Sequence, residues 1–191
     1  MSENQFPSAA QVALELKRER YKSRYKKTLR STVFALVTAA AVAVLVATLW
    51  LPVLQIFGAS MTPNLQEGQI VVSVKTKRMN TGDIIAFYYG NKVLVKRYIA
   101  GPGSWVDIDK DGNVSVDGVA LEEPYLQEKA FGISDLEFPY QVPEASHFLL
   151  GDQRATSVDS RHTAVGCITT DQMVGKILFR VWPLEEFGMV S

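Results

Sequence analysis

The sequence is poor in the residues that build disulfides, metal sites and histidine-based active sites. It contains one cysteine, Cys167, and two histidines, His147 and His162. A single cysteine excludes an intramolecular disulfide and a zinc site made of cysteines. A metal enzyme, or a hydrolase with histidine as its base, would have to use one of the two histidines, and neither has a recognisable motif around it.

Charge is missing from one long stretch of the chain. No charged side chain occurs from Ser31 to Gln66, and positions 33–51, VFALVTAAAVAVLVATLWL, are almost wholly apolar. About twenty such residues in a helix cover the roughly 30 Å of bilayer hydrocarbon. A helix buried in a soluble core would rarely be apolar on every face over this length. The run therefore predicts a transmembrane helix, which we assign to residues 32–54.

Basic residues crowd the segment before this run. The formal net charge of the chain is zero, but residues 1–31 hold eight basic side chains: Lys17, Arg18, Arg20, Lys22, Arg24, Lys26, Lys27 and Arg30. Such a flank is much longer than the n-region of a cleavable signal peptide, which favours a retained anchor. Basic flanks stay in the cytoplasm. We therefore expect a single-pass protein of the cytoplasmic membrane, with residues 1–31 in the cytoplasm and residues 55–191 outside it.

The charge distribution also bears on partners. A net charge of zero gives no reason to expect a nucleic-acid partner. The basic flank is compatible with binding to the headgroups of membrane lipid. The sequence favours the alternative, a solvated segment that only sets the topology.

The residues after the apolar run have β-type patterns. Four short apolar segments, separated by Gly, Asn and Asp, are typical of strands: QIVVSV, DIIAFYY, KVLVKRYIA and SWVDI. Asp117-Gly118 in NVSVDGVAL predicts a two-residue hairpin turn, and MVGKILFRVW from Met173 predicts a last long strand. LQEKAFGISDLEFPYQVP predicts a long surface excursion. We expect a mainly β domain with few helices at residues 55–191, preceded by one transmembrane helix.

A sequence that begins like a calcium-binding loop lies within this domain. DIDKDG starts at Asp107, but Gly118 occupies the twelfth position, where a bidentate glutamate is required. The segment is expected to be a turn of a hairpin, and no metal or other cofactor is expected.

Ser60 and Lys96 are candidates for nucleophilic chemistry. Ser60 lies in GASMTPNLQEG, just after the apolar run, and a serine hydroxyl needs a neighbouring base. A lysine can be that base if its neutral amine is accessible. At an ordinary pKa of about 10.4, only about one lysine in a few thousand is neutral at pH 7, so Lys96 would need burial in its apolar strand. Periodicity alone favours a Lys96 whose ammonium reaches solvent.

Three segments together resemble a known family. SMTP from Ser60, KRYIAGPGS from Lys96 and GDQRATSVDSR from Gly151 are similar, in order and spacing, to three signature boxes of bacterial type I signal peptidases. The resemblance extends from the anchor to about Trp182. It implies the signal-peptidase fold and a membrane-anchored serine endopeptidase that removes signal peptides from exported preproteins after small residues, at sites of the Ala-x-Ala type. The oligomeric state stays open.

The resemblance also implies roles for individual residues. Ser60 matches the nucleophile, Lys96 the general base, and Ser157 the hydroxyl that holds the lysine amine. Asp159 and Arg161 match a buried charged pair near the site.

The resemblance gives no catalytic role to two further residues in or near these segments, Arg97 and Gly58. Arg97 is expected to be structural rather than catalytic. Gly58 stands where some family members have a serine whose hydroxyl donates to the oxyanion, so the second donor of the oxyanion hole is open.

Two other functions fit part of the sequence. Self-cleaving repressors also use a Ser-Lys pair, but they carry a DNA-binding helical domain where this chain has an apolar span. A catalytically silent, membrane-anchored β domain could bind a partner as a scaffold. The presence of both Ser60 and Lys96 argues against a silent domain.

Overall fold

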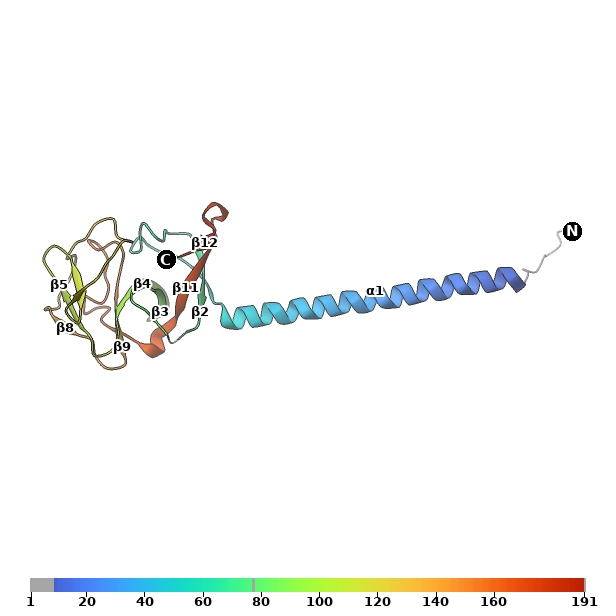
Figure 1. The fold of residues 1–191 in the computed structure, drawn as a ribbon, viewed down its shortest axis with the longest axis horizontal. Coiled ribbons are helices and arrows are strands. Elements are labelled where there is room, and N and C mark those ends of the chain that lie inside the picture. The colour runs from blue at the N-terminus through green and yellow to red at the C-terminus, as the bar shows by residue number, and fades with distance from the viewer. Residues whose placement is uncertain (1–8, 77, 191) are drawn as a thin grey trace. The chain divides into compact units, whose positions relative to one another are not determined.

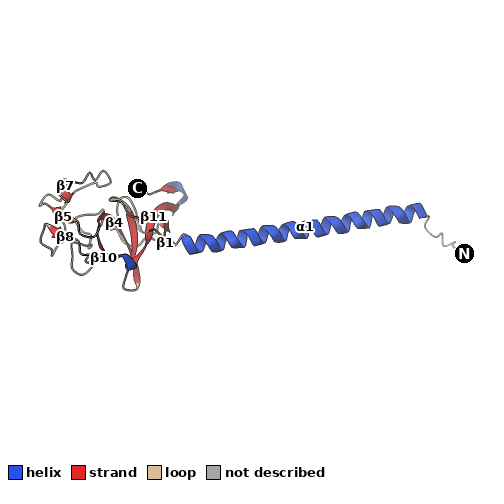
Figure 2. Ribbon diagram, turned by 60° about the horizontal axis from the view of Figure 1, so that its bottom comes forward, coloured by secondary structure: helices blue, strands red, loops and turns tan. Residues whose placement is uncertain are grey.

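This computed structural model describes residues 9–76 and 78–190, and only the backbone of residues 47–50. The chain forms two separate compact units, residues 1–47 and residues 48–191. The first is helical and the second is built of strands (Figures 1 and 2).

Helix α1, Ala9–Trp50, is a single uninterrupted helix of 42 residues. At 1.5 Å per residue it is about 60 Å long, roughly twice the thickness of bilayer hydrocarbon. It includes residues 33–50 of the predicted apolar run and all eight basic side chains before it, and it is long and apolar enough to cross a membrane. The helix ends before residue 54, the limit expected from the sequence, because Pro52 cannot continue a helix and Val53–Gln55 forms strand β1.

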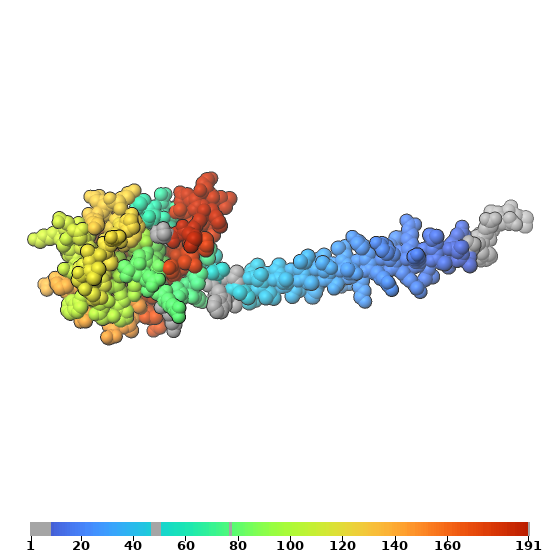
Figure 3. All heavy atoms as spheres, in the orientation of Figure 1, coloured from blue at the N-terminus to red at the C-terminus, as the bar shows by residue number. Residues whose placement is uncertain are grey.

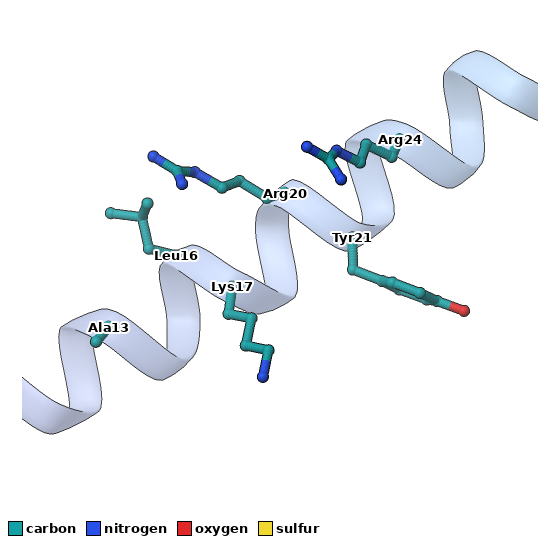
Figure 4. Close-up of a pocket in the computed structure, with 6 residues that line it drawn as sticks. All are labelled: Ala13, Leu16, Lys17, Arg20, Tyr21 and Arg24. Atoms are coloured by element: carbon teal, nitrogen blue, oxygen red, sulfur yellow. The ribbon is translucent and has the colours of Figure 1, made fainter.

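The basic part of α1 has no enclosed site. Figure 4 shows six side chains of this one helix, with Leu16, Arg20 and Arg24 on one side and Lys17 and Tyr21 on the other, so the hollow beside them is open surface: Ala13, Leu16, Lys17, Arg20, Tyr21 and Arg24. Every described side chain from residue 9 to residue 46 is exposed.

The larger sheet of the second unit has the strand order β1-β2-β11-β3-β4-β9-β10, and β12 pairs with β11. Its pairs are antiparallel. The strands are β2 Ile70–Val74, β3 Ile84–Tyr89, β4 Lys92–Ala100, β9 Ser146–Leu150, β10 Ile168–Thr169, β11 Met173–Trp182 and β12 Gly188–Met189, with short 3-10 helices at Thr170–Gln172 and Leu184–Glu186. The strands predicted from Gln69, Asp83, Lys92 and Met173 are thus confirmed.

The smaller sheet has the order β7-β6-β5-β8. Its strands are β5 Trp105–Ile108, β6 Val114–Val116, β7 Val119–Ala120 and β8 Tyr140–Gln141. Val116 pairs with Val119 across Asp117 (φ 52°) and Gly118 (φ 80°), which confirms the predicted two-residue hairpin. The calcium-like segment is a turn in which the Asp109 carboxylate accepts the backbone N–H groups of Asp111 and Asn113.

Apolar side chains pack on both faces of the larger sheet. Ile84 and Ala86 of β3 belong to one cluster, and Ile85 and Phe87 belong to another. Because successive side chains of a strand point to opposite faces, β3 is buried on both sides. This explains why DIIAFYY is a continuous apolar run rather than an alternating one.

The long excursion after β7, residues 126–143, lies at the surface, as predicted, with its residues exposed or half-buried except Val142. Its side chains Phe131, Leu136, Phe138 and Tyr140 pack against a third cluster that includes Phe148 and Val106. Figure 3 shows residues of this excursion, coloured yellow to orange, lying against the green strands. One side of the excursion therefore covers this cluster. Its large aromatic side chains gain apolar contacts there, which the few residues of the smaller sheet alone would not offer.

Candidate active site

Lys96 lies inside the domain. It occupies the middle of β4 opposite Ile85, and it is 3% exposed. Its Nζ donates a hydrogen bond of 2.8 Å to the hydroxyl oxygen of Ser157, which is also buried. The surface position that periodicity favours is therefore wrong, because the chain after β9 covers this part of the strand.

Burial changes the acidity of this lysine. Desolvation lowers the pKa of Lys96 from its ordinary value of 10.5 to about 8. The negative charge of Asp159 opposes this shift, the positive charge of Arg161 supports it, and the negative charge of Asp152 again opposes it. With a pKa of about 8, roughly one lysine in ten is neutral at pH 7. Lys96 is thus able to accept a proton near neutral pH.

Ser60 lies in the loop between β1 and β2, beside the segment that carries Ser157. Its carbonyl oxygen accepts the backbone N–H of Gln153 at 3.0 Å. A Cβ atom on Gly151 would overlap both the Ser157 hydroxyl oxygen and the Ser60 carbonyl oxygen. Only glycine allows the two serine-bearing segments to approach each other this closely.

Among the hydrogen bonds of the described residues, none joins the Ser60 hydroxyl to the Lys96 amine, whose partner is Ser157. Such bonds are often long or absent before substrate binds. The backbone N–H of Ser60 also has no acceptor among the described residues, and it is free to bind an oxygen of another molecule.

Asp159 and Arg161 form a fully buried ion pair. The Arg161 Nη2 atom lies 2.8 Å from Asp159 Oδ2, and both side chains are 0% exposed. The same carboxylate accepts the backbone N–H of Gly151 at 2.9 Å. The pair thus fixes the glycine against which Ser60 and Ser157 pack.

Arg97 forms a second buried pair. Its Nε and Nη2 atoms donate to the two carboxylate oxygens of Asp152 at 2.8 and 2.7 Å. Its Nη1 atom donates to the carbonyl oxygen of Gly82 at 2.6 Å. Because all these bonds are internal, the guanidinium points away from the solvent and anchors β4 to the segment after β9.

Sequence reasoning missed a third buried pair, between Glu123 and Arg154. Their closest atoms are 2.5 Å apart, and the side chains are 0% and 1% exposed. Arg154 lies within GDQRATSVDSR, so the matched segment pointed to it. Glu123 carried no signal, because its partner is distant in sequence.

Gly58 has a backbone conformation with φ at +79°. Its missing side chain would meet no atom within 4 Å, but a serine at this φ would be strained. The conformation of this glycine therefore does not favour a serine hydroxyl as the second oxyanion donor.

The histidines and the cysteine make their contacts elsewhere. His147 hydrogen-bonds to the hydroxyls of Tyr98 and Thr170, and His162 lies 3.6 Å from Asp135. Burial raises the pKa of Cys167 to about 11, so its thiol stays protonated and unreactive at neutral pH. In the part of the chain that the structure describes, no three His, Cys, Asp or Glu residues are grouped to hold a metal ion.

A cleft adjoins Ser60 between two strand edges. Its walls come from residues 54–58 on one side and from Val93, Leu94 and Val95 of β4 on the other. β1 is the terminal strand of its sheet, and the described pairings of β4 with β9 begin only at Arg97. Two unpaired backbone edges therefore border one cleft, and they could bind an extended peptide as an added strand.

Comparisons with known proteins agree on one family. A family model described as "Signal peptidase, peptidase S26" matches residues 29–182. Signal peptidase IB of Staphylococcus aureus (strain COL) is 36% identical in an alignment 152 positions long that covers 69% of this chain and 78% of the relative. Signal peptidase I of Streptococcus pneumoniae serotype 4 is 28% identical over 174 residues, covering 71% of this chain and 84% of the relative. A crystal structure of a signal peptidase I from Enterococcus faecalis V583 has 28% identity and a TM-score of 0.45, covering 53% of this chain and 98% of that one.

Proposed function

This chain belongs to the signal peptidase family, peptidase S26, and we propose that it cleaves signal peptides with Ser60 as nucleophile and Lys96 as general base. Membership of the family makes it a serine peptidase that acts on preproteins with signal peptides. The observation that carries the assignment of the base is the buried Lys96, hydrogen-bonded to Ser157 and with its pKa lowered to about 8.

In the first step Ser60 is acylated. Neutral Lys96 takes the hydroxyl proton while Ser60 Oγ attacks the carbonyl carbon of the scissile bond. The backbone N–H of Ser60 stabilises the oxyanion that forms. The protonated lysine then gives its proton to the leaving nitrogen, which departs as the amino terminus of the mature protein.

In the second step the acyl-enzyme is hydrolysed. Lys96, again neutral, takes a proton from a water molecule whose oxygen attacks the ester carbonyl. The proton returns to Ser60 Oγ as the ester bond breaks, and the signal peptide leaves with a new carboxylate. Ser157 holds the lysine amine in both steps.

The substrate lies in the cleft between the two strand edges. The substrate residues that precede the scissile bond form backbone hydrogen bonds with the free edges of β1 and β4. Their side chains contact the cleft walls near Ile56 and Val95. Walls made of such apolar side chains suit small apolar residues, which supports cleavage at sites of the Ala-x-Ala type.

The helix anchors the protein in the cytoplasmic membrane. Residues 1–31 form the cytoplasmic segment, the apolar part of α1 within residues 32–54 crosses the membrane, and the peptidase domain of residues 55–191 lies outside. The basic side chains before the apolar run support this orientation. Those nearest the run bind anionic lipid headgroups, since a cation near a negatively charged leaflet gains about 1 kcal/mol.

The proposal is tested with the full chain in detergent micelles and a purified preprotein that carries an Ala-x-Ala site. A single cleavage after the second alanine is expected for the wild type, and none for Ser60→Ala. Mass spectrometry of both products locates the bond. If neither protein cleaves any preprotein while both bind it, the chain is a silent binding domain instead.

A further inference from the structure

Asn64 connects the loop of Ser60 to a buried carboxylate. Its Nδ2 atom donates one hydrogen bond to Asp152 Oδ2 at 2.7 Å and one to the carbonyl oxygen of Tyr125 at 2.9 Å. The backbone carbonyl oxygen of Asn64 accepts a hydrogen bond from Arg180 Nη1 at 3.2 Å. The side chain and the backbone of Asn64 are thus both held, although no part of the mechanism uses this residue.

The carboxylate of Asp152 joins the strand that carries the base to the nucleophile loop. On one side it accepts the two hydrogen bonds from Arg97, the residue directly after Lys96 in β4. On the other side it accepts the hydrogen bond from Asn64. Asp152 is 3% and Arg97 is 1% exposed, so water does not compete for these bonds.

We propose that Asn64 is a positioning residue which, through Asp152 and Arg97, sets the separation between the Ser60 hydroxyl and the Lys96 amine. This inference rests on the proposed function, because it concerns the same two reacting groups. Asn64 touches neither of them, so its effect is on their geometry.

The chemistry of the amide suits this position. An Asn side chain has two N–H donors on one nitrogen, and both acceptors beside Asn64 are oxygens. A carboxylate at position 64 would have the same shape but no hydrogen to donate, and it would repel the carboxylate of Asp152. The asparagine amide is therefore required, and an equally sized carboxylate is not a substitute.

Tyr125 completes the arrangement from the other side. Its carbonyl oxygen accepts from Asn64, and the centre of its ring lies 3.7 Å from the Arg97 guanidinium carbon. Its hydroxyl donates to Glu123 Oε1 at 3.1 Å, and Glu123 is the partner of Arg154. The segment around Tyr125 thus holds the Asn64, Asp152 and Arg97 side chains in contact.

The expected consequence is a loss of rate without a loss of the base. A misplacement of about 1 Å between reacting groups can lower a rate by about 100-fold. The burial of Lys96 and its bond to Ser157 involve other residues. A neutral variant at position 64 should therefore keep the pH midpoint of the wild type while its kcat falls.

The test compares Asn64→Asp with Asn113→Asp as a matched control. The amide of Asn113 also donates to an aspartate, Asp109 Oδ2 at 2.8 Å, but it lies exposed in the calcium-like turn. Preprotein cleavage is measured as kcat and KM across pH, per folded molecule, with the folded fraction taken from circular dichroism at the assay temperature. Asn64→Asp should lower kcat by about 100-fold with little change in KM, and Asn113→Asp should match the wild type.

The outcomes separate this inference from the function on which it rests. Cleavage by the wild type but not by Ser60→Ala supports the function, and failure of the wild type to cleave sinks the function itself. If the wild type cleaves and Asn64→Asp matches it per folded molecule, the positioning role is overturned. Where Asn64→Asp does not fold, Asn64→Ser replaces it. That hydroxyl can keep one donor, so a smaller fall in kcat at the same pH midpoint supports the role, and a wild-type kcat overturns it.

Discussion

The amine nitrogen of Lys96 lies 2.8 Å from the hydroxyl oxygen of Ser157, and the two side chains are 3% and 1% exposed. A charged lysine in such a place loses most of its hydration and regains only one neutral partner. The position therefore favours an amine that gives up its proton readily.

Lys96→Arg tests whether this amine acts as a base. Arginine keeps the positive charge, but its pKa above about 12 prevents it from accepting a proton from Ser60. We expect cleavage to fall to the level of Ser60→Ala, measured with the same preprotein. Circular dichroism should show that both variants remain folded. Substantial turnover by Lys96→Arg would exclude the Ser-Lys mechanism.

The pH dependence of cleavage should report the acidity of the same residue. Because burial lowers the pKa of Lys96 to about 8, the fraction of neutral base increases as pH rises toward that value. We expect kcat/KM to rise tenfold per pH unit below about pH 8 and to level off above it. A rise that continued to about pH 10.4 would show instead a solvated lysine.

The lowered pKa of Lys96 should also make the stability of the protein depend on pH. The folded chain releases the Lys96 proton near pH 8, whereas the unfolded chain keeps it to about 10.5. Because the unfolded state binds more protons between these values, stability rises with pH there. Relative to Lys96→Met, the free energy of unfolding of the wild type should increase by about 3 kcal/mol from pH 7 to pH 10.5. Denaturant titrations of both proteins at the two pH values measure this difference. The contributions of the other titrating groups cancel because both proteins contain them.

Asp159→Ala should destabilise the domain as well as slow it. Removing one partner leaves the buried Arg161 uncompensated, which costs roughly 3 to 5 kcal/mol. Glu186→Gln is the control, because Glu186 pairs with Arg180 at 3.1 Å while 42% exposed, and loss of such a pair costs at most about 1 kcal/mol. Thermal melts of the two variants give the comparison. Lost activity at an unchanged melting temperature would point to a direct catalytic role for Asp159.

Topology can be tested by protease accessibility in intact spheroplasts. The basic flank should be protected and the domain after Pro52 digested, because basic residues are retained in the cytoplasm. Fragments are identified by antibodies against tags at each terminus. Digestion of residues 1–31 with protection of the rest would reverse the orientation.

The sequence predicted the strands better than the contacts between them. Runs such as KVLVKRYIA coincide with β4 because β-branched residues favour strands wherever they pack. The burial of Lys96 could not follow from this pattern, since it depends on the segment around Ser157 folding back over β4. The pairing of Asn64 with Asp152 joins positions far apart in the sequence, and no local pattern records it.

The candidate site was predictable mainly through its resemblance to a family. The matched segments contain Ser60, Lys96 and Ser157. Their roles as nucleophile, general base and hydroxyl partner of the lysine remain predictions. Glu123 and Tyr125 lie outside these segments, and their side chains became relevant only through contacts with Arg154 and Arg97. The packing of the excursion after β7 against the core could not be predicted, because its aromatic residues follow neither a strand nor a helix period.

The two free strand edges beside Ser60 set a condition on the shape of any substrate. Each edge bonds to backbone N–H and C=O groups, so it can bind only a chain whose own groups are not already engaged. A helical segment has used these groups internally, and a folded domain has buried them. A helical export signal would therefore have to unwind around its cleavage point before the reaction could start. Local helix stability in the substrate would then control the rate of processing, independently of which side chains flank the bond.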